Sequence, residues 1–259
     1  MTTSPAGTWL LLRSLVVKDL KVRYKRSVLG FFWFLLKPLF SMVVYTIVFT
    51  RIIRFGGAIE HFSLFLLTGL LPWNFFSASL NSSTRSLLDN TRLIRSVYFP
   101  RTTLPVAEVV ANSVHLALAL CVLEVALIAF GHYPGPSLLL VIPATLMMMA
   151  MVSGMGMILA VGNVFYRDVS QLVEILLLAW FYASPIIYPL GEGLVPASVE
   201  SVVRFNPLSG LLSIFHSCLY EGGWPPAWAW VSLTVWTLFF LVVGIAVFRR
   251  AEPVVVKEL

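Results

Sequence analysis

The side chains best able to do chemistry inside this chain are Glu108, Asn112 and His115, which follow one another at spacings of four and three. On a helix, these spacings place all three residues on one face. Ionisable groups gathered on one face of an apolar segment are typical of a proton relay. A more ordinary role for His115 is a hydrogen bond between neighbouring helices, so a proton-coupled transporter is kept only as an alternative.

The sequence lacks the motifs of several enzyme classes. It has no GxxxxGK[ST] loop for nucleotide phosphates, and no glycine is followed by lysine. HExxH and GxSxG are absent as well. Gly154, Gly156 and Gly162 lie inside an apolar run, where small residues favour close helix packing over a dinucleotide turn. We therefore expect a chain that is not an enzyme and binds no cofactor or metal itself.

Two apolar runs carry a mixed aromatic and polar face, with one such residue every four positions, which aligns the side chains on a helix. Aromatic rings offer flat faces to sugar rings, and the polar groups can bond hydroxyls. Such a face suits a wet path or a helix interface, although aromatic residues also form belts at membrane surfaces and Lys37 is able to snorkel to headgroups. The residues are Trp33, Lys37, Ser41 and Tyr45 in the first run, and Trp180, Ser184 and Tyr188 in a later one.

A positively charged stretch, Arg85–Glu108, interrupts the apolar sequence with four arginines against Asp89. Its middle, Thr91–Phe99, predicts a short helix that Pro100 and Pro105 prevent from continuing. A short basic helix between prolines is typical of a docking surface for a partner. An ordinary cytoplasmic loop that obeys membrane charge rules has the same composition, and both interpretations remain open here.

The overall composition is that of an integral membrane protein. The chain has 259 residues, of which 59% are hydrophobic and 12% charged, with a mean hydropathy of +0.90. No signal peptide is recognisable at the start. The net charge of +6 fits cytoplasmic loops better than nucleic-acid binding. Cys121 and Cys218 have no CxxC partner, so the redox compartment is not readable.

Six apolar segments are long enough to cross about 30 Å of hydrocarbon as helices. Charge counting predicts that both termini are cytoplasmic, since the inner segments then hold 14 lysines and arginines and the outer segments three, with Lys37 inside a span. The predicted fold is an all-α membrane protein with six transmembrane helices. The spans are Gly30–Thr50, His61–Leu80, Leu104–Phe130, Ser137–Val164, Leu172–Leu190 and Ala227–Phe248.

The segment before the first span predicts a basic amphipathic helix at the membrane surface. Within residues 9–26, the spacing puts Ser14, Lys18, Lys21 and Lys25 on one helical face, opposite leucine and valine side chains. A charge cluster that only sets topology is the alternative. We accordingly divide the chain into this N-terminal helix at 1–29, a six-span domain at 30–248 and a cytoplasmic tail at 249–259.

The outer segment 191–226 contains two short apolar stretches broken at Asn206-Pro207. Each stretch is too short to cross the bilayer. We expect two short helices that are re-entrant or lie on the outer surface, because re-entrant backbone is tolerated where protein or water satisfies its polar groups.

Several stretches together resemble the membrane subunits of ABC-2 type polysaccharide exporters, which serve O-antigen, capsule and teichoic-acid export. The resemblance covers nearly the whole chain in the right order, with a matching six-span topology, and is weak on the substrate. The stretches are KDLKVRYKRSVLGFFWFLLKPLFSMVVYTIVF, LLTGLLPWNFF, NTRLIRSVYFPRTTLPVAEV, NVFYRDVSQLVEILLLAWFYASPIIYP and FNPL.

The resemblance implies a homodimer in the bacterial cytoplasmic membrane that binds two separate ATPase subunits, which hold the ATP and Mg. It implies that a helix in the first cytoplasmic loop fits the ATPase cleft, and that an FYRD turn sits at the cytoplasmic mouth. By position, the helix is Leu93, Ile94, Arg95, Ser96, Val97, Tyr98 and Phe99, and the turn is Phe165, Tyr166, Arg167 and Asp168.

The resemblance also implies a pore lined by the first, second and fifth spans, which adds Trp73 to the aromatic candidates. The expected cargo is a lipid-linked polysaccharide, and its lipid-diphosphate end needs cations near the inner leaflet. Lys21, Lys25 and Arg26, together with Lys37, are the nearest. A teichoic-acid, capsule or small lipid or drug exporter of the same class is the alternative.

Overall fold

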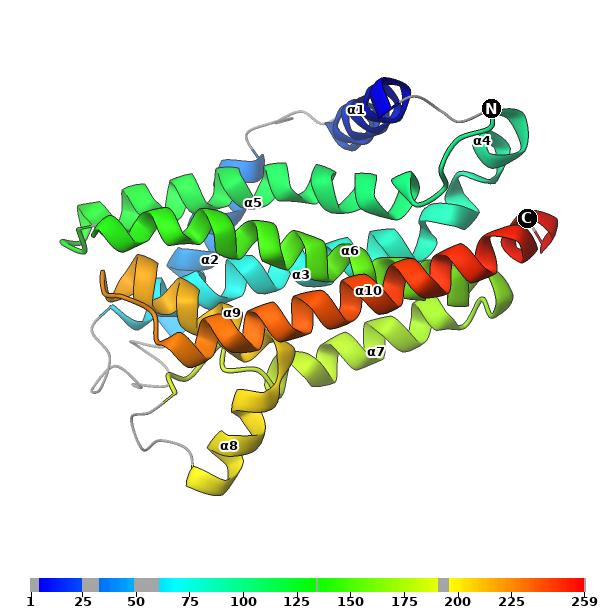
Figure 1. Cartoon of the computed structure of the whole chain (residues 1–259). Helices are drawn as coiled ribbons and strands as arrows, with labels where there is room; N and C mark the ends of the chain where they lie inside the picture. The colour runs from blue at the N-terminus through cyan, green and yellow to red at the C-terminus, as the bar shows by residue number, and fades with distance from the viewer. Residues whose placement is uncertain (1–4, 25–32, 49–60, 134, 191–195, 259) are drawn as a thin grey trace.

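The computed structural model describes the chain except for residues 1–4, 25–32, 49–60, 134, 191–195 and 259. All regular secondary structure in the described residues is helical, as predicted (Figure 1). The elements are α1 (Pro5–Tyr24), α2 (Trp33–Ile47), α3 (Phe62–Asp89), α4 (Thr91–Ser96), α5 (Thr103–Ala129), η3 (Pro136–Leu140), α6 (Val141–Phe165), α7 (Val169–Tyr182), α8 (Ala197–Phe205), α9 (Pro207–Phe215), η4 (His216–Tyr220) and α10 (Ala227–Glu258).

Four helical segments in the described residues are long and apolar enough to cross a membrane, namely α3, α5, η3 with α6, and α10. The other two predicted spans coincide with α2, of 15 residues, and α7, of 14 residues. At a rise of 1.5 Å per residue, α7 covers only about 21 Å. The chain is therefore a multi-pass helical membrane protein.

The predicted fifth span, Leu172–Leu190, is helical only as far as Tyr182. Pro185 explains the early end, because a proline disfavours helical backbone in the residue before it and removes a donor. The residues from Ala183 onward form turns instead. Helix α7 is thus shorter at the α8 end than the sequence predicts.

Helix α3 occupies the centre of the bundle and packs against α5, α6 and α7. On α6, Gly154 and Gly156 allow close contacts, as predicted. A Cβ added at Gly154 would collide with the carbonyl oxygen of Phe240 on α10, and one at Gly156 would lie 2.7 Å from the Cβ of Ser83 on α3. Gly244 of α10 meets the Gly154 backbone in the same way. Small residues therefore set the separation of α6 from its neighbours.

The long helices place the connecting segments at two opposite ends of the bundle (Figure 1). One end carries α4 and the C-terminal end of α10, and α1 crosses α5 on this side of the molecule. The opposite end carries α8, α9 and the first turn of α10. Ring contacts there join His61, before α3, to Phe130, after α5 (5.2 Å), and His132 to Tyr220 (4.7 Å).

The C-terminal residues predicted as a tail continue the last helix. Helix α10 runs through Pro253 to Glu258. Phe248 and Val255 are each only 1% exposed. Hydrophobic burial of this kind stabilises a helix end that sequence hydropathy alone would leave outside the domain.

Candidate functional site

The short loop helix is held by buried side chains at the α10 end of the bundle. Ile94 and Phe99 are each 4% exposed and belong to a hydrophobic cluster, which we call the anchor cluster. This cluster joins α3, α5, α6 and α10 beneath α4. Two buried side chains thus anchor the segment to the helices beneath it. The anchor cluster consists of Leu87, Ile94, Phe99, Leu104, Met157, Ala160, Val161, Phe248 and Val255.

The helix expected over Thr91–Phe99 ends at Ser96, which corrects the predicted boundary. Val97 is extended, with φ −135° and ψ 140°. Pro100 restricts only Phe99, the residue before it, to extended backbone and stops a helix from continuing past it, so the earlier end at Ser96 has another cause. Of the seven residues Leu93, Ile94, Arg95, Ser96, Val97, Tyr98 and Phe99, only the first four are helical.

The outward side of this segment is basic and aromatic. Arg92 and Arg95 are exposed, and the side chains of Val97 and Tyr98 are 53% and 70% exposed. Exposed apolar and aromatic groups beside arginines are the composition of a protein interface core. A rigid, anchored segment that presents such side chains is suited to receive a partner.

An ion pair connects the end of this loop to the last helix. Arg101 Nη1 donates to Glu252 Oε1 at 3.0 Å, and the two side chains are 13% and 31% exposed. The Arg101 guanidinium also lies 5.7 Å from the centre of the Tyr98 ring. The loop is therefore joined to α10 by both the anchor cluster and this pair.

Helix α1 lies against the same region. Leu11 and Leu15 pack on the anchor cluster, whereas Ser14, Lys18 and Lys21 are exposed. Lys18 Nζ is 3.4 Å from Asn90 Oδ1, at the junction of α3 and α4. Of the described polar side chains of the predicted interface helix, Lys18 reaches the α3–α4 junction, and Ser14 and Lys21 are exposed. The other two cations of this group, Lys25 and Arg26, lie outside the described residues.

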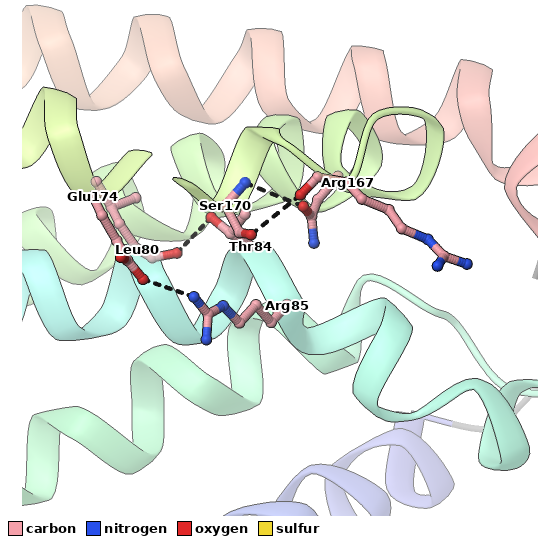
Figure 2. A network of polar contacts seen from close by, with 7 residues as sticks. Leu80, Thr84, Arg85, Arg167, Ser170 and Glu174 are labelled. Atoms are coloured by element: carbon pink, nitrogen blue, oxygen red, sulfur yellow. Dashed lines mark hydrogen bonds and ion pairs between the residues drawn. The ribbon is translucent and has the colours of Figure 1, made fainter. Parts of the chain in front are cut away.

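The predicted mouth turn, Phe165, Tyr166, Arg167 and Asp168, joins α6 to α7 and is exposed throughout. Asn163 Oδ1 accepts a bond from the Ser170 backbone N–H at 3.2 Å and closes the turn. Figure 2 shows Arg85 of α3 reaching Glu174 of α7, with Nη2 and Oε1 2.7 Å apart, while the Arg167 side chain points away from this pair.

Asn206 organises the opposite end. Its Oδ1 accepts from the Leu208 backbone N–H and from Trp180 Nε1, both at 3.0 Å, and so caps α9 and holds α7. Its Nδ2 donates to the Ala183 carbonyl and to Ser184 Oγ, also at 3.0 Å. One amide therefore ties the end of α7 to the start of α9.

The predicted aromatic path residues occupy different environments. Trp73 is 7% exposed, with Phe76 and Phe181 rings 5.6 and 5.5 Å away. Trp180 is partly buried by Phe76, and Ser184 is buried. Tyr188 lies partly exposed after α7, and Ser41 is partly buried in α2. The side chains of Trp33, Lys37 and Tyr45 lie outside the described residues.

Sequence reasoning missed Asn206 as a bonding centre and Arg101 with Glu252 as a pair. The Asn-Pro step signals a helix cap, which is the role that Asn206 has. Nothing in the sequence joins Arg101 to Glu252 across 151 positions. On α5, Asn112 Nδ2 donates to Ser82 Oγ of α3 at 3.1 Å, so this member of the polar stripe takes part in helix packing.

Comparisons with known proteins agree with this architecture. The family model described as ABC-2 type transporter matches residues 11–220. The chain is 33% identical over 244 residues to a protein named O-antigen export system permease protein RfbA from Myxococcus xanthus, with 93% of each chain covered. It is 30% identical to a protein of the same name from Klebsiella pneumoniae, with 91% and 89% covered.

A more distant relative is the polysialic acid transport protein KpsM of Escherichia coli, at 22% identity with 92% of each chain covered. The family model and these relatives span α1 through η4, which include the anchored loop, the mouth turn and Asn206. The chain belongs to the ABC-2 type transporter family of membrane permeases.

Proposed function

We propose that this chain is the permease subunit of an ATP-driven exporter of a lipid-linked, O-antigen-like polysaccharide, located in the bacterial cytoplasmic membrane. Full-length similarity to two permeases named for O-antigen export carries the proposal. The relative named for polysialic acid transport supports the broader class of polysaccharide cargo, including capsule. ATP and Mg are held by a separate ATPase, two copies of which bind a homodimer of this chain.

The anchored loop is the proposed ATPase contact. Arg95, Val97 and Tyr98 present an exposed basic and aromatic surface, and Ile94 and Phe99 transmit its displacement into the anchor cluster. Closure of the ATPase subunits would then push α4, and α3, α5 and α10 would rock as connected rigid bodies. The α4 end and both termini are cytoplasmic in this proposal.

The proposed translocation path lies at the homodimer axis. A glycan cannot cross hydrocarbon, because its hydroxyls would lose water without replacement. The path would be lined by residues that offer stacking and hydrogen bonds, namely Trp33, Lys37, Ser41 and Tyr45 of α2, Trp180 of α7, and Ser184 and Tyr188 after α7. The Trp73 ring packs behind these residues, in contact with the ring of Phe181.

Other parts of the chain serve the ends of this path. The short helices α8 and α9 cover the outer opening, and the exposed turn at residues 165–168 forms the cytoplasmic mouth. The exposed Lys21, together with Lys25 and Arg26, meets the lipid diphosphate at the inner leaflet.

The decisive experiment supplies the chain to cells whose own permease gene is deleted. We expect surface glycan to return, with no lipid-linked glycan retained inside. Arg95→Ala combined with Tyr98→Ala should abolish copurification of the ATPase or uncouple its hydrolysis from export. The matched control, Arg249→Ala with Tyr133→Ala, removes an exposed arginine and tyrosine outside α4. Failure of the parent chain to restore surface glycan would refute the proposed function.

A further inference from the structure

A cavity of about 270 Å³ opens at the end of the bundle opposite α4. It lies between the first turns of α3, the segment after α7, the end of α8, and the α9–η4 region with its loop into α10. Pockets for small molecules begin at about 300 Å³, so this cavity suits one ring rather than a long chain.

Besides Phe65, which stacks on His216, three aromatic side chains line the cavity. The Trp224 side chain is 71% exposed, which is unusual for so large a ring. Trp228 is partly buried, and the Arg204 guanidinium lies over its ring, 5.0 Å from the centre. Tyr188, from the aromatic set of the α7 segment, contributes the third ring. Flat apolar faces beside an open cavity are suited to the faces of a sugar ring.

The opposite wall is polar and contains an unsatisfied group. His216 is 6% exposed and stacks on Phe65, with ring centres 4.2 Å apart. Its Nε2 has no hydrogen-bond partner in the part of the chain that the structure describes. That nitrogen is buried and faces Gly69 of α3, where an added Cβ would lie 2.9 Å from it, so it is closed to a ligand in the cavity. The lining groups that can bond a ligand are Ser213, Ser217 and Glu221.

The charges of the cavity disfavour an anionic ligand. Arg204 donates from Nε and Nη2 to the same Glu200 oxygen, at 3.0 and 2.7 Å, so its charge is already compensated. Glu221 adds a negative charge to the lining. A phosphate would meet no uncompensated cation among these described residues, whereas a neutral, hydroxyl-rich ligand meets donors and acceptors of both kinds.

We propose that this cavity is an outer subsite that holds one neutral sugar residue of the glycan as it leaves the protein. The inference rests on the proposed export function and adds a contact region beyond the aromatic path, with Tyr188 common to both. The family match ends at residue 220, so Glu221, Trp224 and Trp228 lie beyond it. The rings hold the sugar faces, and Ser213 and Glu221 bond its hydroxyls.

The test uses accessibility in export-competent cells. Ser213→Cys places a nearly isosteric thiol in the cavity wall of a chain carrying Cys121→Ser and Cys218→Ala, and a membrane-impermeant maleimide is added from outside. Labelling during export should be slower than in cells unable to make the glycan, by roughly threefold for a site filled about two-thirds of the time. Tyr133→Cys is the control, since Tyr133 is 75% exposed at the same end and lies outside the cavity.

A second variant keeps the proposal testable if the thiol disturbs the cavity. The double variant Trp224→Ala with Trp228→Ala should lower export roughly two- to tenfold, the factor that corresponds to the free energy of about one aromatic contact. The control Tyr133→Ala should leave export unchanged. Two results would overturn the subsite alone. One is normal export by the double variant, and the other is glycan synthesis that slows labelling at Ser213→Cys no more than at Tyr133→Cys. A parent chain that moves no glycan to the surface would refute the export function and the subsite together.

Discussion

The pair formed by Arg101 and Glu252 offers a direct test of how the loop is coupled to the last helix. Exposed ion pairs contribute about 0–1 kcal/mol, and removing one partner of a fully buried pair costs about 3–5 kcal/mol. With side chains 13% and 31% exposed at 3.0 Å, this pair lies between those limits. We expect a coupling of about 1–2 kcal/mol in a double-mutant cycle.

The cycle consists of Arg101→Ala, Glu252→Ala and the double variant, each purified in the same detergent and melted. A stability change of this size should lower Tm by roughly 2–8 °C for a chain of this length. The stability losses of the two single variants should sum to more than the loss of the double variant. The reason is that the second substitution removes a charge that the first had already left unpaired. The charge exchange Arg101→Glu with Glu252→Arg should recover part of the loss and of the export rate.

Arg85 and Glu174 provide the matched control. They form an interhelical pair at 2.7 Å, but their side chains are 50% and 56% exposed. Their cycle should give no more than about 1 kcal/mol, because solvent screens the pair. The reasoning that this contact joins the loop to α10 would be refuted by one result. That result is a coupling free energy for Arg101 with Glu252 no larger than the one for the control pair.

Three further predictions follow from the packing and the proposed path. Gly154→Ala should destabilise the fold by more than about 1 kcal/mol, because its Cβ meets the α10 backbone. Gly162→Ala should be tolerated, because the nearest side-chain atom lies 3.7 Å from its Cβ. Equal melting temperatures of the two variants would contradict this. Asn206→Ala should cost about 2 kcal/mol by removing the α9 cap and leaving Trp180 Nε1 unpaired, while the exposed Asn74→Ala should be neutral in the same melt. A triple variant should lose most export yet still copurify with the ATPase; its changes are Trp33→Ala, Tyr45→Ala and Trp180→Phe. Near-normal export by this variant would argue that these rings face lipid.

The helical class and the sites of the main connections could be predicted because they depend on local patterns. Apolar length, prolines and arginine counts place the loop at residues 91–100 and the break at Asn206-Pro207. Gly154 and Gly156 were interpretable in the same way, since small residues in an apolar helix have few other roles.

The remaining features depend on contacts between distant segments, which no local pattern records. Sequence hydropathy ends the last span at Phe248, but Val255 is buried in the anchor cluster and the helix continues. Likewise, the pattern of Thr91–Phe99 favours helix throughout, and the stop at Ser96 allows Phe99 to enter the anchor cluster. Tertiary burial decided both boundaries against the local preference.

The early end of α7 and the bonds of Asn206 are explained by one requirement. In the proposed six-span topology, the 14 residues of α7 cover about 21 Å, and the chain covers the remaining depth of the membrane without helical hydrogen bonds. Such backbone is tolerated only where protein satisfies it. Asn206 does this for the Ala183 carbonyl, and Ser184 and Ile186 are buried. The end of α7 is therefore fixed to the start of α9 through the Asn206 side chain rather than by helical hydrogen bonds.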